Sequence, residues 1–186
     1  MYRQVVTCPL HQKPETNNMF DFIAYMKNLA EKSVHIQHSE YKPAFHRITN
    51  LSSLEELLSN MGTVDGYQMI VEDVLEGMFI DAGASLVDYP TYRFYIVKNA
   101  PANDFDAKEQ AKKDCMNVIR KIIGRIRRDN YNDAAGETTN GLRDLERNSF
   151  QYFSVGPLLD GFWGIQCSFN IHEHANCVYN ADDWNE

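Results

Sequence analysis

The chain has 186 residues, of which 44% are hydrophobic and 12% aromatic, and its net charge is −8. This composition is typical of one globular domain with a sizeable core and excludes a disordered chain. An acidic chain is also a poor binder of free nucleic acid, because the neutralisation of phosphates dominates that affinity. The sequence has no apolar run of about 18 residues and no apolar leader segment, so we expect neither a membrane span nor a secretory signal.

Composition divides the chain into a polar arm at residues 1–16, a single domain at 17–174 and an acidic tail at 175–186. The arm contains two prolines and is too short and too polar to fold alone. The cysteines are widely spaced and form no CxxC pair, so we expect reduced, mostly buried thiols of a cytosolic protein: Cys8, Cys115, Cys167 and Cys177.

The first elements are predicted from the spacing of apolar residues. Asn17 or Asn18 is expected to cap a helix that runs to about Lys32. A second, short helix is expected near residues 52–58, and a turn is expected at 88–90. Strands are predicted where the apolar period becomes two, at residues 34–38, 44–48, 67–75, 78–82 and 92–98.

A long helix is predicted at about residues 105–129, capped by Asn103 or Asp104. At 100° per residue, the side of this helix opposite its apolar stripe gathers Lys113, Asn117, Arg120, Gly124 and Arg127. Residues 108–128 carry a balance of +6 and the rest of the chain −14. Three interpretations stay open for this face: contact with solvent, contact with an acidic partner, or contact with DNA that passes through a channel.

The last part of the domain is predicted to hold a flexible polar loop at 130–147 and a hairpin at 150–174. The corner of the hairpin is unusually apolar, with Leu158, Leu159, Phe162 and Trp163 around its turn-forming residues. Such side chains either fold back onto the core or contact a partner, and both alternatives stay open. Because the strands cluster and do not alternate with helices, we predict an α+β fold. Its mixed, mostly antiparallel sheet is flanked by one long helix and one or two shorter ones.

The best metal candidates are His172, His174 and Cys177, since residues two apart on a strand share a face. Zinc sites usually show tighter paired spacing, so we favour polar residues on the exposed side of the last strand. The sequence contains no nucleophile elbow, no P-loop and no dinucleotide fingerprint. We therefore expect no enzyme activity, no bound metal and no cofactor.

The phrase TYRFYIVKNA at 91–100, the long helix and polar loop that follow, and FSVGPLLDGFWGIQCSFNIHE at 153–173 together resemble a known family. They are similar to small neck and tail proteins of tailed bacteriophages and prophages, of the tail-terminator and head–tail joining type. The resemblance covers residues 67–174. It implies a non-enzymatic α+β subunit of the virion, made in the cytoplasm of the bacterial host.

The resemblance further implies a ring of identical subunits, commonly a hexamer, that caps the tail tube and joins it to the head connector. The partners would be neighbouring copies, the tail-tube protein and the connector protein. A ring needs two different complementary patches on each subunit, and we expect the basic helix face and the apolar corner to contribute to them. One alternative is a cellular adaptor or ligand-binding domain that acts as a monomer or dimer. The other is a metal-dependent enzyme that uses His172, His174 and Cys177.

Overall fold

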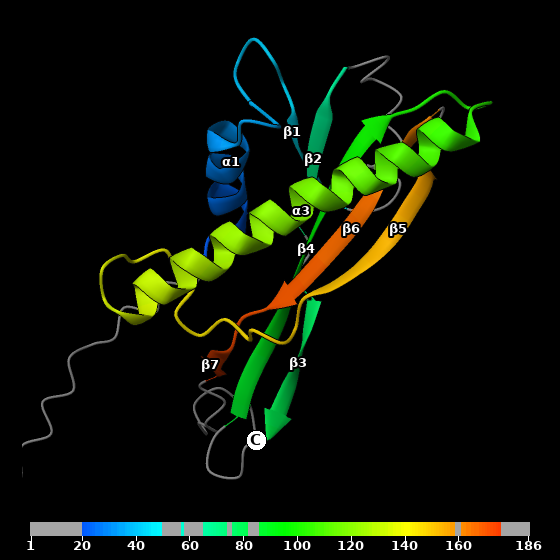
Figure 1. Ribbon diagram of the computed structural model, residues 1–186. Helices are drawn as coiled ribbons and strands as arrows, with labels where there is room; N and C mark the ends of the chain where they lie inside the picture. Colours follow the sequence, from blue (N-terminus) through cyan, green and yellow to red (C-terminus); the bar gives the residue numbers. More distant parts are fainter. Residues whose placement is uncertain are drawn as a thin grey trace, which may run out of the picture.

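The structure is a computed structural model, and it describes residues 20–49, 57, 65–73, 76–81, 86–158 and 161–175, the last three by their backbone. Within this part of the chain, a seven-stranded mixed sheet carries two helices on one face (Figure 1). The predicted α+β class is therefore confirmed. The arm at 1–16 and the tail from residue 176 onward lie outside the described residues.

The sheet is organised around one strand, β4, which is 14 residues long. Its order is β1-β2-β4-β6-β5, and β3 and β7 pair with the first part of β4. Thr91 of β4 faces Glu76 of β3 on one side and Asn170 of β6 on the other, so β3 and β6 flank β4 from opposite sides. Only the β1–β2 pair is parallel among the described pairs. The strands are β1 (Phe45–Ile48), β2 (Tyr67–Glu72), β3 (Glu76–Asp81), β4 (Leu86–Asn99), β5 (Gln151–Leu158), β6 (Phe162–Asn170) and β7 (Glu173–Ala175).

The two helices are α1 (Phe22–Lys32) and α3 (Phe105–Ala134), and an aspartate caps each of them. The Asp104 carboxylate accepts a hydrogen bond from the Ala107 amide at 2.9 Å, so one of the two predicted caps is the observed one. The predicted cap of the first helix is wrong, because Asp21 fills that role by accepting from the Ala24 amide at 2.9 Å. Asn17 and Asn18 lie outside the described residues.

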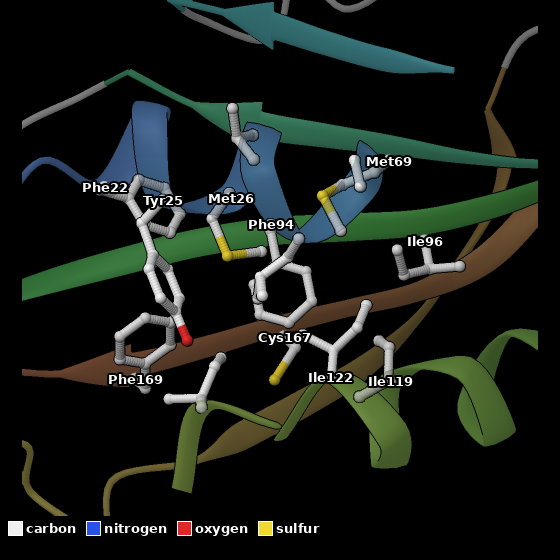
Figure 2. Close-up of a cluster of buried hydrophobic side chains, with 14 of the residues drawn as sticks. Phe22, Tyr25, Met26, Met69, Phe94, Ile96, Ile119, Ile122, Cys167 and Phe169 are labelled. Carbon is white, nitrogen blue, oxygen red and sulfur yellow. The ribbon is translucent and has the colours of Figure 1, made fainter. Parts of the chain in front are cut away.

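The main core lies between the sheet and both helices (Figure 2). Met26 of α1, Phe94 and Ile96 of β4 and Ile119 of α3 are fully buried there. Burial of each such side chain stabilises the fold by about 1.5–3 kcal/mol. A smaller cluster covers the opposite face of the sheet, and its buried members are Ile48, Ile70, Tyr95, Val97 and Phe162.

The strand predicted at 34–38 is wrong. This segment is a turn in which the Gln37 amide donates to the Ser33 carbonyl at 2.8 Å and the His38 amide to the Ala30 carbonyl at 3.1 Å. Ile36 is fully buried in the main core. The apolar residues of this segment therefore reflect a connection that folds back under α1, and they do not mark a strand.

The turn predicted at 88–90 is also wrong, because β4 runs through these residues. A proline is tolerated inside a strand only where its missing N–H is not needed. Pro90 meets this condition, since on the side of β6 and β7 the ladder is interrupted between Asp88 and Thr91. The side chain of Asn170 fills the interruption and donates to the Pro90 carbonyl at 3.1 Å and to Thr91 Oγ1 at 2.8 Å.

The predicted loop at 130–147 begins too early, because α3 continues to Ala134. The rest of the segment is not simply a polar loop, since Leu142 and Leu145 are buried in the main core. The predicted strands at 44–48, 67–75, 78–82 and 92–98 correspond to β1, β2, β3 and β4, and the hairpin at 150–174 to β5, β6 and β7. Of the short helix expected at 52–58, only Leu57 lies within the described residues, and it is helical.

Candidate subunit interface

The outward side of α3 carries a basic strip, which we define as Lys113, Arg120 and Arg127. All three are exposed, as is Gly124 between them, which confirms the predicted orientation of the helix. The flanks of the helix are occupied by contacts within the chain. On one flank, Lys98 Nζ of β4 lies 3.0 Å from Asp114, whereas the strip itself points away from the core.

A groove of about 490 Å³ lies beside the basic strip, between α3 and the last two strands of the sheet. Its floor includes Ile165 of β6 and Ser154 of β5, and Met116 contributes an apolar wall from the helix. Lys113 and Arg120 also line it. Lys112 and the acidic Glu109 line it as well, so cations outnumber anions around a partly apolar groove. Such a groove suits a ligand that combines an apolar side chain with nearby negative charge.

The apolar corner of the hairpin is mostly folded back. Phe162 is 3% exposed within the smaller cluster, and Leu158 packs against that cluster while partly buried. Trp163 lies under two cations, with Lys108 Nζ and Lys112 Nζ each 5.1 Å from its ring. Leu159 lies outside the described residues. Phe162 therefore folds back onto the core, which is one of the two alternatives for this corner. The role of the corner in a subunit contact stays a prediction.

A glycine fixes the close packing of this corner. Gly156 has φ +127, and a Cβ there would lie 2.7 Å from Trp163 Cε3. A side chain at this position would therefore push the indole ring away from the hairpin.

The hairpin instead exposes two aromatic residues that the sequence did not single out. Tyr152 is 62% exposed and Phe153 57% exposed, on β5 at the edge of the sheet. The signal that distinguishes them is the position of β5 at the edge of the sheet, and it follows from the topology and not from local spacing.

β3 is the most exposed strand of the sheet. In Figure 1, β3, β7 and the first half of β4 extend beyond both helices. We call β3 and the part of β4 that pairs with it (Leu86–Thr91) the β3 arm. All six residues of β3 are exposed, including Met78 (59%), Phe79 (62%) and Ile80 (41%). Sequence reasoning missed this surface, because an apolar strand is normally taken as a core strand.

Ion pairs connect the base of the β3 arm to the body of the sheet. The Arg93 guanidinium on β4 contacts the carboxylates of Glu72 at the end of β2 and of Glu76 at the start of β3. The Tyr95 hydroxyl donates to Glu72 as well. These contacts tie the arm to the sheet at its base and leave its apolar side chains in solvent.

The histidine cluster expected as the best metal candidate is only partly described. The His172 ring lies 4.2 Å from the Tyr89 ring, and its Nε2 lies 3.1 Å from Glu146 Oε2. The half-buried ring is thus less exposed than predicted. The side chain of His174 and all of Cys177 lie outside the described residues. Over the residues that are described, no three His, Cys, Asp or Glu side chains gather as a metal site would require.

Two of the four thiols are described, and both are free and buried, as predicted. Burial raises the pKa of Cys115 and of Cys167 to about 12. These thiols therefore stay protonated at neutral pH and serve as core side chains.

No protein-family model matches the chain, and no curated protein matches it either. In the described ranges, no helix is both long and apolar enough to cross a membrane.

Proposed function

We propose that this chain is a structural subunit that assembles into a closed ring of identical copies, at the junction of neck and tail in a tailed bacteriophage. In this role it resembles a tail terminator: the ring caps the tail tube and offers a surface to the head connector. The proposal takes its setting from the resemblance at residues 67–174 and its mode of action from the surfaces of the chain.

The observation that carries the proposal is the presence of two unlike exposed surfaces on one chain. One is the β3 arm, with its exposed apolar side chains. The other is the groove between α3 and β5, with the exposed Tyr152 on the same face of the sheet and the basic strip beside it. A head-to-tail ring requires two unlike, complementary patches, whereas a two-fold dimer uses one self-complementary patch.

The charge distribution supports the same arrangement. Residues 108–128 carry a balance of +6, and the remainder of the chain carries −14. A basic strip on one copy therefore meets an acidic body on the next, which favours unlike contacts over contacts between identical surfaces.

The state of association tests the ring. In light scattering after size-exclusion chromatography, the purified chain of 21.5 kDa should elute as one species of several copies, with six copies at about 129 kDa favoured. A stable monomer or dimer at tens of micromolar concentration would instead support an adaptor or ligand-binding domain.

The location in the particle needs a separate test. A gold-labelled antibody against the chain should mark the head-proximal end of the tail on particles of the phage or prophage that encodes it. Label on the capsid or on fibres, or no label, would reject the junction while leaving the ring to be judged by its mass.

A further inference from the structure

Two strand edges of the sheet are open on opposite sides of the molecule. β5 is the last strand in the sheet order, and β3 pairs only with β4, so each has an outer edge without a partner among the described residues. Proteins usually protect such edges with charged residues or proline. In β5 the proline and a register shift lie in its last residues, and in β3 the charged residues lie at the two ends, so residues 151–155 and 77–80 between them contain neither kind of protection. Both stretches therefore have the character of strands that pair with another chain.

We propose that β3 of one copy adds to β5 of the next copy as an antiparallel strand, so that the sheets of neighbouring subunits become continuous. This inference rests on the proposed ring, of which it names one contact. Main-chain hydrogen bonds supply the pairing, and the exposed side chains of the two strands supply the specificity.

The faces of β5 are fixed by its pairing with β6. Directly opposed residues of neighbouring strands share a face, and successive residues alternate between faces. Tyr152 is opposite Cys167, which is opposite Phe94 of the main core. Tyr152 therefore lies on the face that carries the helices, and Phe153 lies on the other face.

The faces of β3 follow in the same way. Phe79 is opposite Asp88 of β4, an even number of residues from Phe94. Phe79 therefore shares the helix-bearing face, whereas Met78 and Ile80 share the opposite one. In a ring, the helix-bearing faces of neighbouring sheets lie on the same side. Phe79 of one copy then meets Tyr152 of the next on that face, and Met78 and Ile80 meet Phe153 on the opposite face. Apolar side chains thus oppose apolar side chains on both faces.

The strand directions agree with this pairing. β5 runs parallel to β4, because both are antiparallel to β6, and β3 runs antiparallel to β4. When the sheet of one copy continues into that of the next, β3 and β5 therefore meet antiparallel.

The stagger between the two strands also fits a closed ring. β3 is level with residues 86–91 of β4, and residues 151–155 of β5 are level with 93–97. This offset is about 21 Å along the strands, and one subunit repeat spans four strand spacings, or about 19 Å. The strands would then incline at roughly 45° to the ring axis, close to the tilt of closed barrels.

Two other pairings fit less well. Pairing of β5 with β5 of a second copy would set two α3 helices side by side on one face, with their basic strips adjacent. Pairing of β3 with β3 would leave the uncharged edge of β5 exposed.

Photocrosslinking tests the contact directly. Full-length chain with benzoylphenylalanine in place of Tyr152 is mixed with ¹⁵N-labelled chain, irradiated, digested and mapped by mass spectrometry. We expect crosslinks between unlike isotopes that reach residues 76–81. The same probe in place of Tyr41, which is 95% exposed and belongs to neither edge strand, should give no such product.

A variant gives the second readout. Phe79→Lys should weaken self-association at least about 50-fold, since it places a charge in an apolar strand contact, and Tyr41→Lys should leave it unchanged. Circular dichroism confirms that both variants are folded. If the chain assembles normally but its crosslinks from position 152 reach β5 or another segment, the β3–β5 contact is refuted and the ring stands. If the wild-type chain is a monomer by light scattering, the ring itself is refuted, and the contact falls with it.

Discussion

Replacement of Asp133 by alanine should destabilise the fold strongly, because this carboxylate organises the segment that leads from α3 to β5. Its two oxygens accept hydrogen bonds from the Leu142 amide at 2.8 Å and the Asn140 amide at 3.0 Å. The Thr138 hydroxyl and the Asn140 side chain also donate to it. Asp133 itself is 7% exposed.

The magnitude follows from the donors that the alanine variant would leave unpaired. A hydrogen bond to a charged acceptor contributes about 1.5–3 kcal/mol, and a buried donor without a partner costs about 1–3 kcal/mol. Leu142 is fully buried, so its amide bears the full cost, whereas Asn140 is exposed and water can replace its partner. We expect Asp133→Ala to lower the free energy of unfolding by about 3 kcal/mol.

The effect should depend on pH in a defined direction. Burial alone raises the pKa of Asp133, but the hydrogen bonds from Thr138, Asn140 and Leu142 outweigh burial, and the pKa is lowered. A carboxylate with a lowered folded-state pKa stabilises the protein above its unfolded pKa of about 3.9 and ceases to do so as the pH falls through the folded value. The ionic part of the difference between wild type and variant should therefore be complete at pH 6 and shrink below about pH 4.

Urea unfolding followed by circular dichroism measures both effects, at concentrations where light scattering shows one association state. Asp144→Ala is the matched control, since Asp144 is an exposed aspartate of the same segment, and we expect a change within about 0.5 kcal/mol. A loss below about 1 kcal/mol for Asp133→Ala, or one equal to that of the control, would refute this reasoning.

Three further predictions concern packing, thiol reactivity and charge. Gly164→Ala should lower the free energy of unfolding by at least about 3 kcal/mol, measured in urea, because a Cβ there would lie 2.0 Å from a carbonyl oxygen of β4. The control variant Gly124→Ala, on the exposed side of α3, should be neutral or stabilising. Cys167, whose pKa is raised to about 12 by burial, should resist iodoacetamide at pH 8 until the chain unfolds, and rapid labelling of the folded chain in peptide maps would argue against a buried thiol. Reversal of all three charges of the basic strip should weaken assembly most at low salt, where screening is least, and assembly unchanged at low salt would show that the strip contacts only solvent.

The parts of the fold that the sequence predicted well are those that local spacing determines. The apolar stripe of α3 repeats at helical spacing over many turns, and Asp104 sits at its start, so the helix and its cap were both accessible. β2, β4 and β6 contain long runs of β-branched and aromatic residues, which identified the sheet and the α+β class.

The parts that it missed depend on contacts between distant residues. Pro90 reads as a turn former, and only the gap between β6 and β7 allows it inside β4. Residues 135–147 read as a polar loop, and only Asp133 and Asn130 explain why that segment is packed.

The candidate interface was predicted only in part. Spacing on the helix located the basic strip, because α3 is regular. It did not locate the exposed residues of β3 and β5, since an apolar strand in the middle of a sheet and one at its edge have the same local pattern. The corner around Phe162 attracted attention by its composition, yet the smaller cluster of the sheet buries that side chain.

The central claim is that identical copies close into a ring through unlike surfaces, and electron cryomicroscopy of the assembled chain tests it most directly. We expect closed rings with a single rotational axis, in which each copy contacts its two neighbours through different surfaces, with β3 of one copy beside β5 of the next. Isolated monomers, or two-fold dimers joined through the same surface on both copies, would contradict it.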